Sequence, residues 1–167
     1  KDLVIDGTFS GGAAPYTSAL VGYIHKNAVN VELTNIINKA NVTVTYSTNA
    51  NVRSGGLVGF IQGSSAAANI TIQNCSNHGE IKYTGTQAQP YIGGIVGYID
   101  GAGSHTVIID ECRNYGNITS SGTAAGILGV SSKAGCIVRN CANLGTLDLQ
   151  DKTQGAGIVN NMTNGTI

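Results

Sequence analysis

The sequence predicts an all-β fold in the form of a right-handed parallel β-helix, a solenoid of stacked coils. Two short phrases recur along its 167 residues at a period in the thirties, which indicates stacked units rather than a globule around one central core. The composition agrees, because 24 glycines and many Val, Ile, Thr and Asn residues are typical of short strands and tight turns. No segment keeps a helical period over three turns.

The first phrase, the glycine-aliphatic phrase, has copies at Ala19 to Ile24, Gly56 to Ile61, Gly94 to Ile99, Gly126 to Val130 and, shortened, Gly157 to Val159. The second, the asparagine phrase, follows the first four copies at Ile36 to Ala40, Cys75 to Gly79, Cys112 to Gly116 and Cys141 to Gly145. We therefore expect one β-solenoid domain, divided into a partial first coil (1–17), four repeats (18–55, 56–93, 94–125 and 126–156) and a truncated repeat (157–167).

Apolar residues hold fixed offsets around each asparagine phrase. The three clearest columns are Val31, Ile70, Val107 and Cys136, then Leu33, Ile72, Ile109 and Val138, then Val42, Ile81, Ile118 and Leu147. Period-two spacing that breaks at a polar pair, such as Gln73-Asn74, and then resumes predicts a strand, a corner and another strand. We expect three strands in each repeat, each paired in parallel with its copy one coil away, and about four full coils with partial coils at both ends.

Two positions in the asparagine phrase predict how the coils turn and stack. An Asn stands two residues after the phrase begins in every full copy, at Asn38, Asn77, Asn114 and Asn143. Amides at a repeated corner can bond both their own turn and the Asn of the next coil, which predicts an asparagine ladder. The Gly that closes the phrase, replaced by Ala40 in the first copy, predicts a positive φ or a close backbone approach.

Three cysteines form one predicted column, Cys75, Cys112 and Cys141, in which the first copy has Ile36. Exchange with Ile at an equivalent position favours buried, free thiols in the core. A disulfide between neighbouring coils stays an alternative, although parallel Cβ directions suit it poorly. The spacing of Cys and His residues matches no zinc motif, and we expect neither a metal nor a cofactor.

The charge balance and the hydropathy of the chain exclude two classes of function. Nine basic and nine acidic residues balance, so nucleic acid is not an expected partner, and no apolar run is long enough to span a membrane. The chain opens on Lys1, with neither an initiator Met nor a signal sequence, and we expect a piece of a longer array that adjoins further domains. Polysaccharide-degrading β-helix enzymes need several converging carboxylates, whereas the acids here are scattered, so we expect no catalytic residues.

Aromatic residues follow the glycine-aliphatic phrases at Tyr23, Phe60 and Tyr98. If Leu57 and its equivalents point inward, then Val21, Val58, Val96 and Leu128 point outward together with the aromatics, and this outer face must be covered or must bind a ligand. Stacked rings on a rigid sheet suit sugars or a hydrophobic partner. Two alternatives stay open: segments Gly11 to Thr17 and Gly85 to Tyr91 fold over the column, or the rings fill the interior.

The glycine-aliphatic phrases, such as Gly56-Leu57-Val58-Gly59 and Gly94-Ile95-Val96-Gly97, alternate with Cys-x-Asn-x-Gly and resemble the repeat known as the GLUG motif. The likeness covers about residues 18 to 160, and the first copy departs most, since it lacks the leading Gly, the Cys and the final Gly. The resemblance implies a large exported bacterial cell-surface protein, in which such repeats accompany peptidase or adhesion modules. It supplies no catalytic residues.

We therefore expect a noncatalytic, extracellular repeat module, adhesin-like or stalk-like, that presents edge loops and an apolar strand face to a ligand or a neighbouring domain. Candidate partners are a glycan or a host matrix protein, and the candidate ligand-binding residues are Tyr23, Phe60 and Tyr98. The alternative is the scaffold or groove of an extracellular polysaccharide-degrading enzyme. A pure spacer is a third possibility.

Overall fold

The structure, a computed structural model, describes residues 1–12, 14–47, 51–63, 68–86, 89–150 and 154–167. These residues form strands and connecting turns but no helix, and every strand pairing is parallel. The predicted parallel β-helix is thus confirmed. None of the described residues belongs to a helix long and apolar enough to cross a lipid bilayer.

Five parallel sheets run along the stack. Sheet A contains β1 (Leu3–Ile5), β6 (Ile36–Asn38), β11 (Ser76–Asn77), β16 (Arg113–Asn114) and β21 (Ala142–Asn143). Sheet B contains β2 (Thr8–Gly11), β7 (Asn41–Val44), β12 (Ile81–Tyr83), β17 (Ile118–Thr119) and β22 (Leu147–Asp148). Sheet C contains β3 (Tyr16–Ser18), β8 (Arg53–Gly55), β13 (Tyr91–Gly93), β18 (Thr123–Ala125) and β23 (Gly155–Ala156).

The remaining two sheets complete each coil. Sheet D contains β4 (Val21–Ile24), β9 (Val58–Ile61), β14 (Val96–Ile99), β19 (Leu128–Ser131) and β24 (Val159–Met162). Sheet E contains β5 (Val31–Thr34), β10 (Asn69–Gln73), β15 (Thr106–Asp110) and β20 (Ile137–Arg139). A full coil visits sheets E, A, B, C and D in turn, so it has five strands rather than the expected three. The short strands of sheets A and C are the ones that the apolar columns did not reveal.

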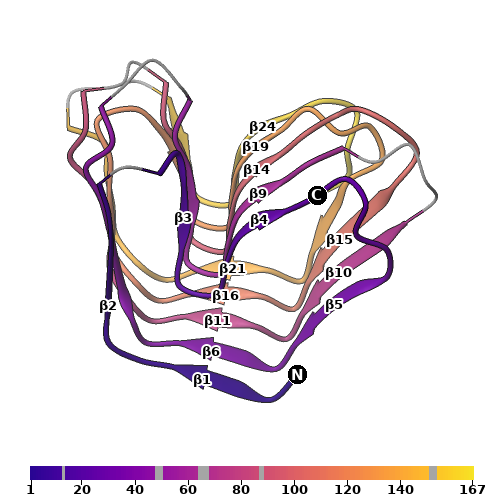
Figure 1. Cartoon of the computed structure of the whole chain (residues 1–167), viewed down its shortest axis with the longest axis horizontal. Coiled ribbons are helices and arrows are strands. Elements are labelled where there is room, and N and C mark those ends of the chain that lie inside the picture. The colour runs from indigo at the N-terminus through magenta and orange to yellow at the C-terminus, as the bar shows by residue number, and fades with distance from the viewer. Residues whose placement is uncertain (13, 48–50, 64–67, 87–88, 151–153) are drawn as a thin grey trace.

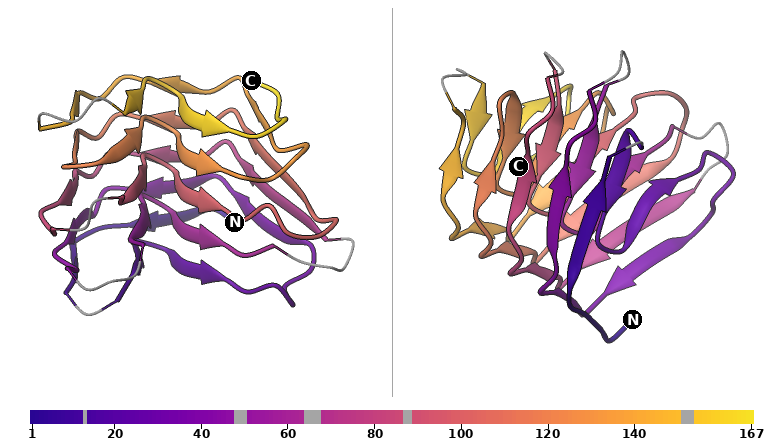
Figure 2. Two further views of the ribbon diagram at one scale, coloured as in Figure 1. Left: turned by 90° about the horizontal axis from the view of Figure 1, so that it is seen from above. Right: turned by 60° about the vertical axis from the view of Figure 1, so that its left-hand side comes forward.

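The coil is folded in cross-section rather than round (Figure 1). Sheets B and C stand side by side as a narrow lobe, sheets D and E enclose a second lobe, and sheet A lies along the base. The chain turns clockwise as it recedes from the viewer in Figure 1, which makes the coil right-handed, and the coils stack in order from the N-terminus to the C-terminus (Figure 2). In the part of the chain that the structure describes, strands pair only with those of adjacent coils, as in other solenoids.

Each lobe has its own apolar core. The larger cluster fills the space between sheets A, D and E, and its fully buried members include Leu57, Ile72 and Ile109. The smaller cluster lies between sheets B and C around Val42, Ile81 and Tyr83. Because equivalent side chains of successive coils lie over one another, the core is a set of columns rather than a single centre.

The corner between sheets E and A is made by one residue per coil in the left-handed region. Asn35, Asn74, Glu111 and Asn140 have φ angles of 57°, 50°, 54° and 52°. Asn tolerates this conformation better than most residues, which explains why the second member of the predicted polar pair is so often Asn. The corner is therefore where the sequence predicted it.

The asparagine ladder is present and has a direction. Asn38 Nδ2 donates to Asn77 Oδ1 at 2.7 Å, and two further bonds of 2.8 Å join Asn77 to Asn114 and Asn114 to Asn143. Each of these amides also donates to the backbone carbonyl two residues ahead, as Asn77 does to Gly79 at 2.9 Å. The ladder thus satisfies buried carbonyl groups at the turn and ties neighbouring coils together.

The Gly that closes the asparagine phrase is required by a close backbone approach and not by a positive φ. A Cβ on Gly79 would lie 1.9 Å from the carbonyl oxygen of Ala40, and a Cβ on Gly116 would lie 1.9 Å from that of Gly79. The positive-φ form of the prediction is wrong, because φ is positive only at other glycines among those that the structure describes. In the first asparagine phrase this position is occupied by Ala40, which is buried. The equivalent residue of the preceding partial coil is Gly7.

All four cysteines are free thiols. Cys75 and Cys112 are buried with Ile36 in the larger cluster, and Cys141 continues the column at the last full coil. Hydrogen bonding with the thiols of Cys141 and Cys75, together with burial, raises the pKa of Cys112. Burial raises the pKa of Cys136 to about 11. These thiols are core side chains, as the column predicted.

Candidate functional site

The predicted aromatic column lies on the outer side of sheet D, facing sheet C. Tyr23 and Phe60 stack at 5.2 Å between ring centroids, and Phe60 and Tyr98 follow at 5.7 Å. Side chains of sheet C meet them. Tyr16 stacks on Tyr23 at 5.4 Å, and Tyr91 stacks on Tyr98 at 5.1 Å. We call the set Tyr16, Tyr23, Arg53, Phe60, Tyr91 and Tyr98 the aromatic seam.

A guanidinium completes the seam. The Arg53 Cζ atom lies 4.0 Å from the centroid of the Phe60 ring and 4.5 Å from that of Tyr98. Such cation–π contacts are worth more as they lose water, and here Phe60 is only 5% exposed. Arg53 therefore holds sheet C to sheet D across the angle between them.

Glycine lets the two sheets come this close. A Cβ on Gly97 would lie 2.6 Å from both the backbone nitrogen and the carbonyl oxygen of Ser54 in sheet C. A Cβ on Gly59 would lie 2.9 Å from the carbonyl oxygen of Arg53 in sheet C and 2.7 Å from that of Gly22 in the next strand of sheet D. The second glycine of the glycine-aliphatic phrase thus permits the seam that the following aromatic residue fills.

The structure answers both open alternatives for the column. The rings do not fill the core, and part of their cover comes from segments Gly11 to Thr17 and Gly85 to Tyr91, which contribute Tyr16 and Tyr91. Residue 13 and residues 87–88 of these segments lie outside the described residues. Tyr23, 37% exposed, is the open end of the seam.

The expectation that Val21, Val58, Val96 and Leu128 point outward is wrong. All four pack in the larger core cluster, together with the residues that precede them. The reason is a backbone bend at the start of β9, β14 and β19, where two consecutive N–H groups share one acceptor. Leu57 N and Val58 N both donate to Ile95 O, at 3.1 and 3.0 Å. Two successive side chains therefore face the same side, as at a β-bulge.

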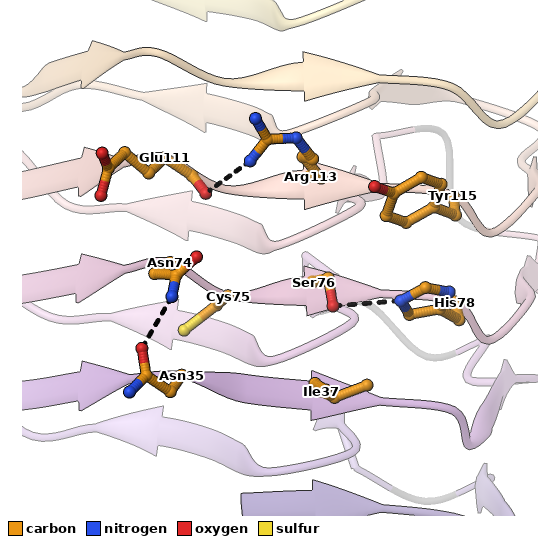
Figure 3. A pocket seen from close by; sticks show the side chains of 9 residues that line it. All are labelled: Asn35, Ile37, Asn74, Cys75, Ser76, His78, Glu111, Arg113 and Tyr115. Carbon is orange, nitrogen blue, oxygen red and sulfur yellow. Dashed lines mark hydrogen bonds between the residues drawn. The ribbon is translucent and has the colours of Figure 1, made fainter. Parts of the chain in front are cut away.

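A second feature, which the sequence reasoning missed, lies on the outer face of sheet A. The outward residues of the middle coils are Ile37, then Ser76 and His78, then Arg113 and Tyr115. Ser76 is short and stands between the longer Ile37 and Arg113, so the face is hollowed there (Figure 3). The hollow has a volume of about 390 Å³.

One wall of the hollow is formed by aromatic rings. His78 and Tyr115 stack with their centroids 4.5 Å apart and an angle of 17° between the ring planes. Ser76 Oγ lies 3.1 Å from His78 Nε2, which orients the imidazole. Tyr115 is 43% exposed and Ile37 is 37% exposed, so apolar surface remains open to a ligand.

The opposite wall is the polar corner between sheets E and A. Asn74 Nδ2 donates to Asn35 Oδ1 at 2.8 Å, and Gln73 Nε2 donates to Glu111 Oε2 at 3.2 Å. In Figure 3 the oxygen of the Asn74 side chain points away from Asn35, and the Arg113 guanidinium reaches toward the backbone carbonyl of Glu111, to which its Nη1 donates at 3.4 Å. Amide, carboxylate and guanidinium groups thus border one small space that also has an apolar side.

Outside the hollow, Asp110, Arg139 and His25 have partners within the chain. Arg139 Nη2 and Nε donate to Asp110 Oδ2 at 2.9 and 3.0 Å, and this hydrogen bonding lowers the pKa of Asp110. His25 packs edge-on against Tyr23 at 5.8 Å. Within the described ranges, no three His, Cys, Asp or Glu side chains gather closely enough to hold a metal ion.

The fold and these surfaces define the class, a parallel β-solenoid repeat protein with uniform inner columns and coil-specific outer faces. Compared with known proteins, the chain matches no family model, no curated protein and no solved structure. The likeness to GLUG repeats therefore stays a resemblance carried by the two phrases.

Proposed function

We propose that the chain is a noncatalytic repeat module of an exported bacterial surface protein, and that it holds a ligand on an outer strand face. The inner columns provide a rigid scaffold, and the outward positions provide the chemistry. Support for the location comes from the resemblance to surface repeats. Support for ligand binding comes from the outer face of sheet A.

The observation that carries the proposal is the contrast between inward and outward positions of the asparagine phrase. The inward ones stay the same from coil to coil, as Cys or Ile and then Asn. The outward ones change from Ile37 and Lys39 to Ser76 and His78 and then to Arg113 and Tyr115. A spacer needs only solvated outer residues, whereas a hollow lined by rings, amides and opposite charges is what small-molecule sites have.

The aromatic seam supports the same function in a different way. Most of its ring surface is buried in contacts between sheets C and D, so the seam fixes the shape of the coil. Tyr23 is the ring that remains exposed to a partner. We therefore place the ligand on sheet A and give Phe60 and Tyr98 a packing role.

The test is retention of the 167-residue chain on immobilised glycans and on immobilised collagen and fibronectin, with analysis of the glycans after contact. We expect saturable retention and glycans of unchanged length. Release of shortened glycans would instead establish the polysaccharide-degrading alternative.

A further inference from the structure

We propose that the hollow on sheet A binds an uncharged oligosaccharide, laid across the coils of β6, β11 and β16. The inference rests on the proposed function and names its ligand. The ligand would lie in the space lined by Asn35, Ile37, Asn74, Ser76, Arg113 and Tyr115.

Charge selects an uncharged ligand. The lining residues include one guanidinium, Arg113, and one carboxylate, Glu111, in the same coil. Charges on an exposed face act over about 8 to 10 Å at physiological salt, so a ligand in the hollow is within reach of both Arg113 and Glu111. An acidic sugar would be attracted by Arg113 but repelled by Glu111, and a basic ligand would be attracted by Glu111 but repelled by Arg113. A neutral ligand that both donates and accepts hydrogen bonds meets neither penalty.

The kinds of polar group select hydroxyls. The Glu111 carboxylate can accept, and the Asn74 amide offers an oxygen on the side away from Asn35. Arg113 can donate through the N–H groups that remain beside its own bond to the Glu111 carbonyl. Neighbouring hydroxyls on a sugar ring supply both a donor and an acceptor, so one ring can engage such a set. A peptide would present its polar groups mainly along one extended backbone and would need a free strand edge, which the centre of sheet A does not have.

The apolar part of the hollow suits the other side of a sugar. Ile37 and Tyr115 expose apolar surface on opposite sides of Ser76. The C–H faces of sugar rings pack on such surfaces, while their hydroxyl edges reach polar groups. Apolar and polar walls around a short floor residue therefore match an amphipathic ring.

The spacing of the coils sets the length of the ligand. Adjacent strands of sheet A lie about 4.8 Å apart, so contact with both Ile37 and Arg113 spans two intervals, or about 10 Å. That exceeds a single sugar ring and fits a disaccharide unit running along the solenoid axis. The volume of about 390 Å³ agrees, since it lies near the lower end of small-molecule sites.

The experiment measures binding of the full chain to an array of uncharged oligosaccharides, beside sialylated and sulfated ones and beside collagen and fibronectin. Ser76→Trp fills the hollow, and Arg113→Gln removes its cation. The matched controls are Thr119→Trp and Lys82→Gln, which make the same kinds of change on the outer face of sheet B. Circular dichroism and urea unfolding verify that all four variants fold.

We expect at least one uncharged oligosaccharide to bind, Ser76→Trp and Arg113→Gln to weaken it at least about tenfold, and both controls to bind as the parent does. Equal binding by all five proteins would overturn the hollow as the site. Retention only on acidic glycans or only on matrix protein would overturn the ligand class and leave the proposed function standing. Retention on none of the surfaces would overturn both.

Discussion

Asn77 is the residue on which the stacking of coils can be tested most directly. Its side chain accepts from Asn38 and donates to Gly79 O and Asn114 Oδ1, and all three bonds are buried. Replacement by Leu removes the Asn77 donor from Gly79 O and Asn114 Oδ1 and removes the acceptor of one Asn38 N–H, whereas Asn38 keeps its bond to Ala40 O. Each buried group left unsatisfied costs about 1 to 3 kcal/mol.

We therefore expect Asn77→Leu to lower the free energy of unfolding by about 3 to 5 kcal/mol in urea titrations. Asn117→Leu is the control, because Asn117 is exposed directly before β17 and its side chain accepts one bond, from Thr146 N at 3.0 Å. A loss of the same size in both variants would mean that the buried ladder has no special part in stability.

Asp110 provides a second test, in the pH dependence of stability. Its pKa is lowered in the folded state, chiefly by hydrogen bonds from Arg139. The usual value in an unfolded chain is about 3.9. The stabilisation is therefore complete above that value and is lost as the pH falls through the lower folded pKa.

The expected result is that the parent loses more unfolding free energy between neutral pH and strong acid than Asp110→Asn does. Urea titrations across that range measure both slopes. The aspartate would have no such role if the two proteins lost stability in parallel.

At the scale of elements, the contact between sheets C and D depends on small backbone positions. A methyl group on Gly97 would lie 2.6 Å from the backbone of Ser54, so Gly97→Ala must push β14 away from β8. We expect a loss of about 1 to 3 kcal/mol, the usual cost of overpacking. Gly157→Ala is the control, since a Cβ there has no described atom within 4 Å. Equal stability of the two variants would contradict the tight contact.

The seam itself can be separated from a ligand platform through Tyr98. This ring contacts Phe60, Tyr91 and the Arg53 guanidinium, and its hydroxyl lies 3.0 Å from Ser132 Oγ. Tyr98→Ser should lower the unfolding free energy by about 2 to 4 kcal/mol. Unchanged thermal and urea stability, with loss only of ligand affinity, would return Tyr98 to the role of a binding residue.

Columns of apolar side chains predicted most of the strands. Strands too short to show an alternation of apolar and polar residues were not predicted. Sheets B, D and E appear as apolar columns around Val42, Val58 and Ile72. Strands of sheets A and C contain two or three residues each, too few for an alternation to be seen. The facing of Val58 was missed because Leu57 N and Val58 N share one acceptor, a backbone feature that no periodicity reports.

For the molecule as a whole, the candidate site was harder to predict than the scaffold. The offsets already placed Ser76 between Ile37 and Arg113 on one column, and that change in size was the available signal. The offsets could not predict that these side chains point outward, because that direction depends on each coil having a separate strand in sheet A. The partners of Tyr98 were only partly predictable: the segment Gly85 to Tyr91 was one expected cover and supplies Tyr91, whereas no pattern indicated Arg53.

The separation of a uniform interior from a binding exterior is tested most directly by NMR titration of the ¹⁵N-labelled chain with the uncharged oligosaccharide that binds best on the array. The account predicts shift changes confined to amides around Asn35, Ser76 and Arg113, on three adjacent coils of sheet A. Changes centred on Tyr23 and Phe60 in the aromatic seam, with none on sheet A, would contradict it.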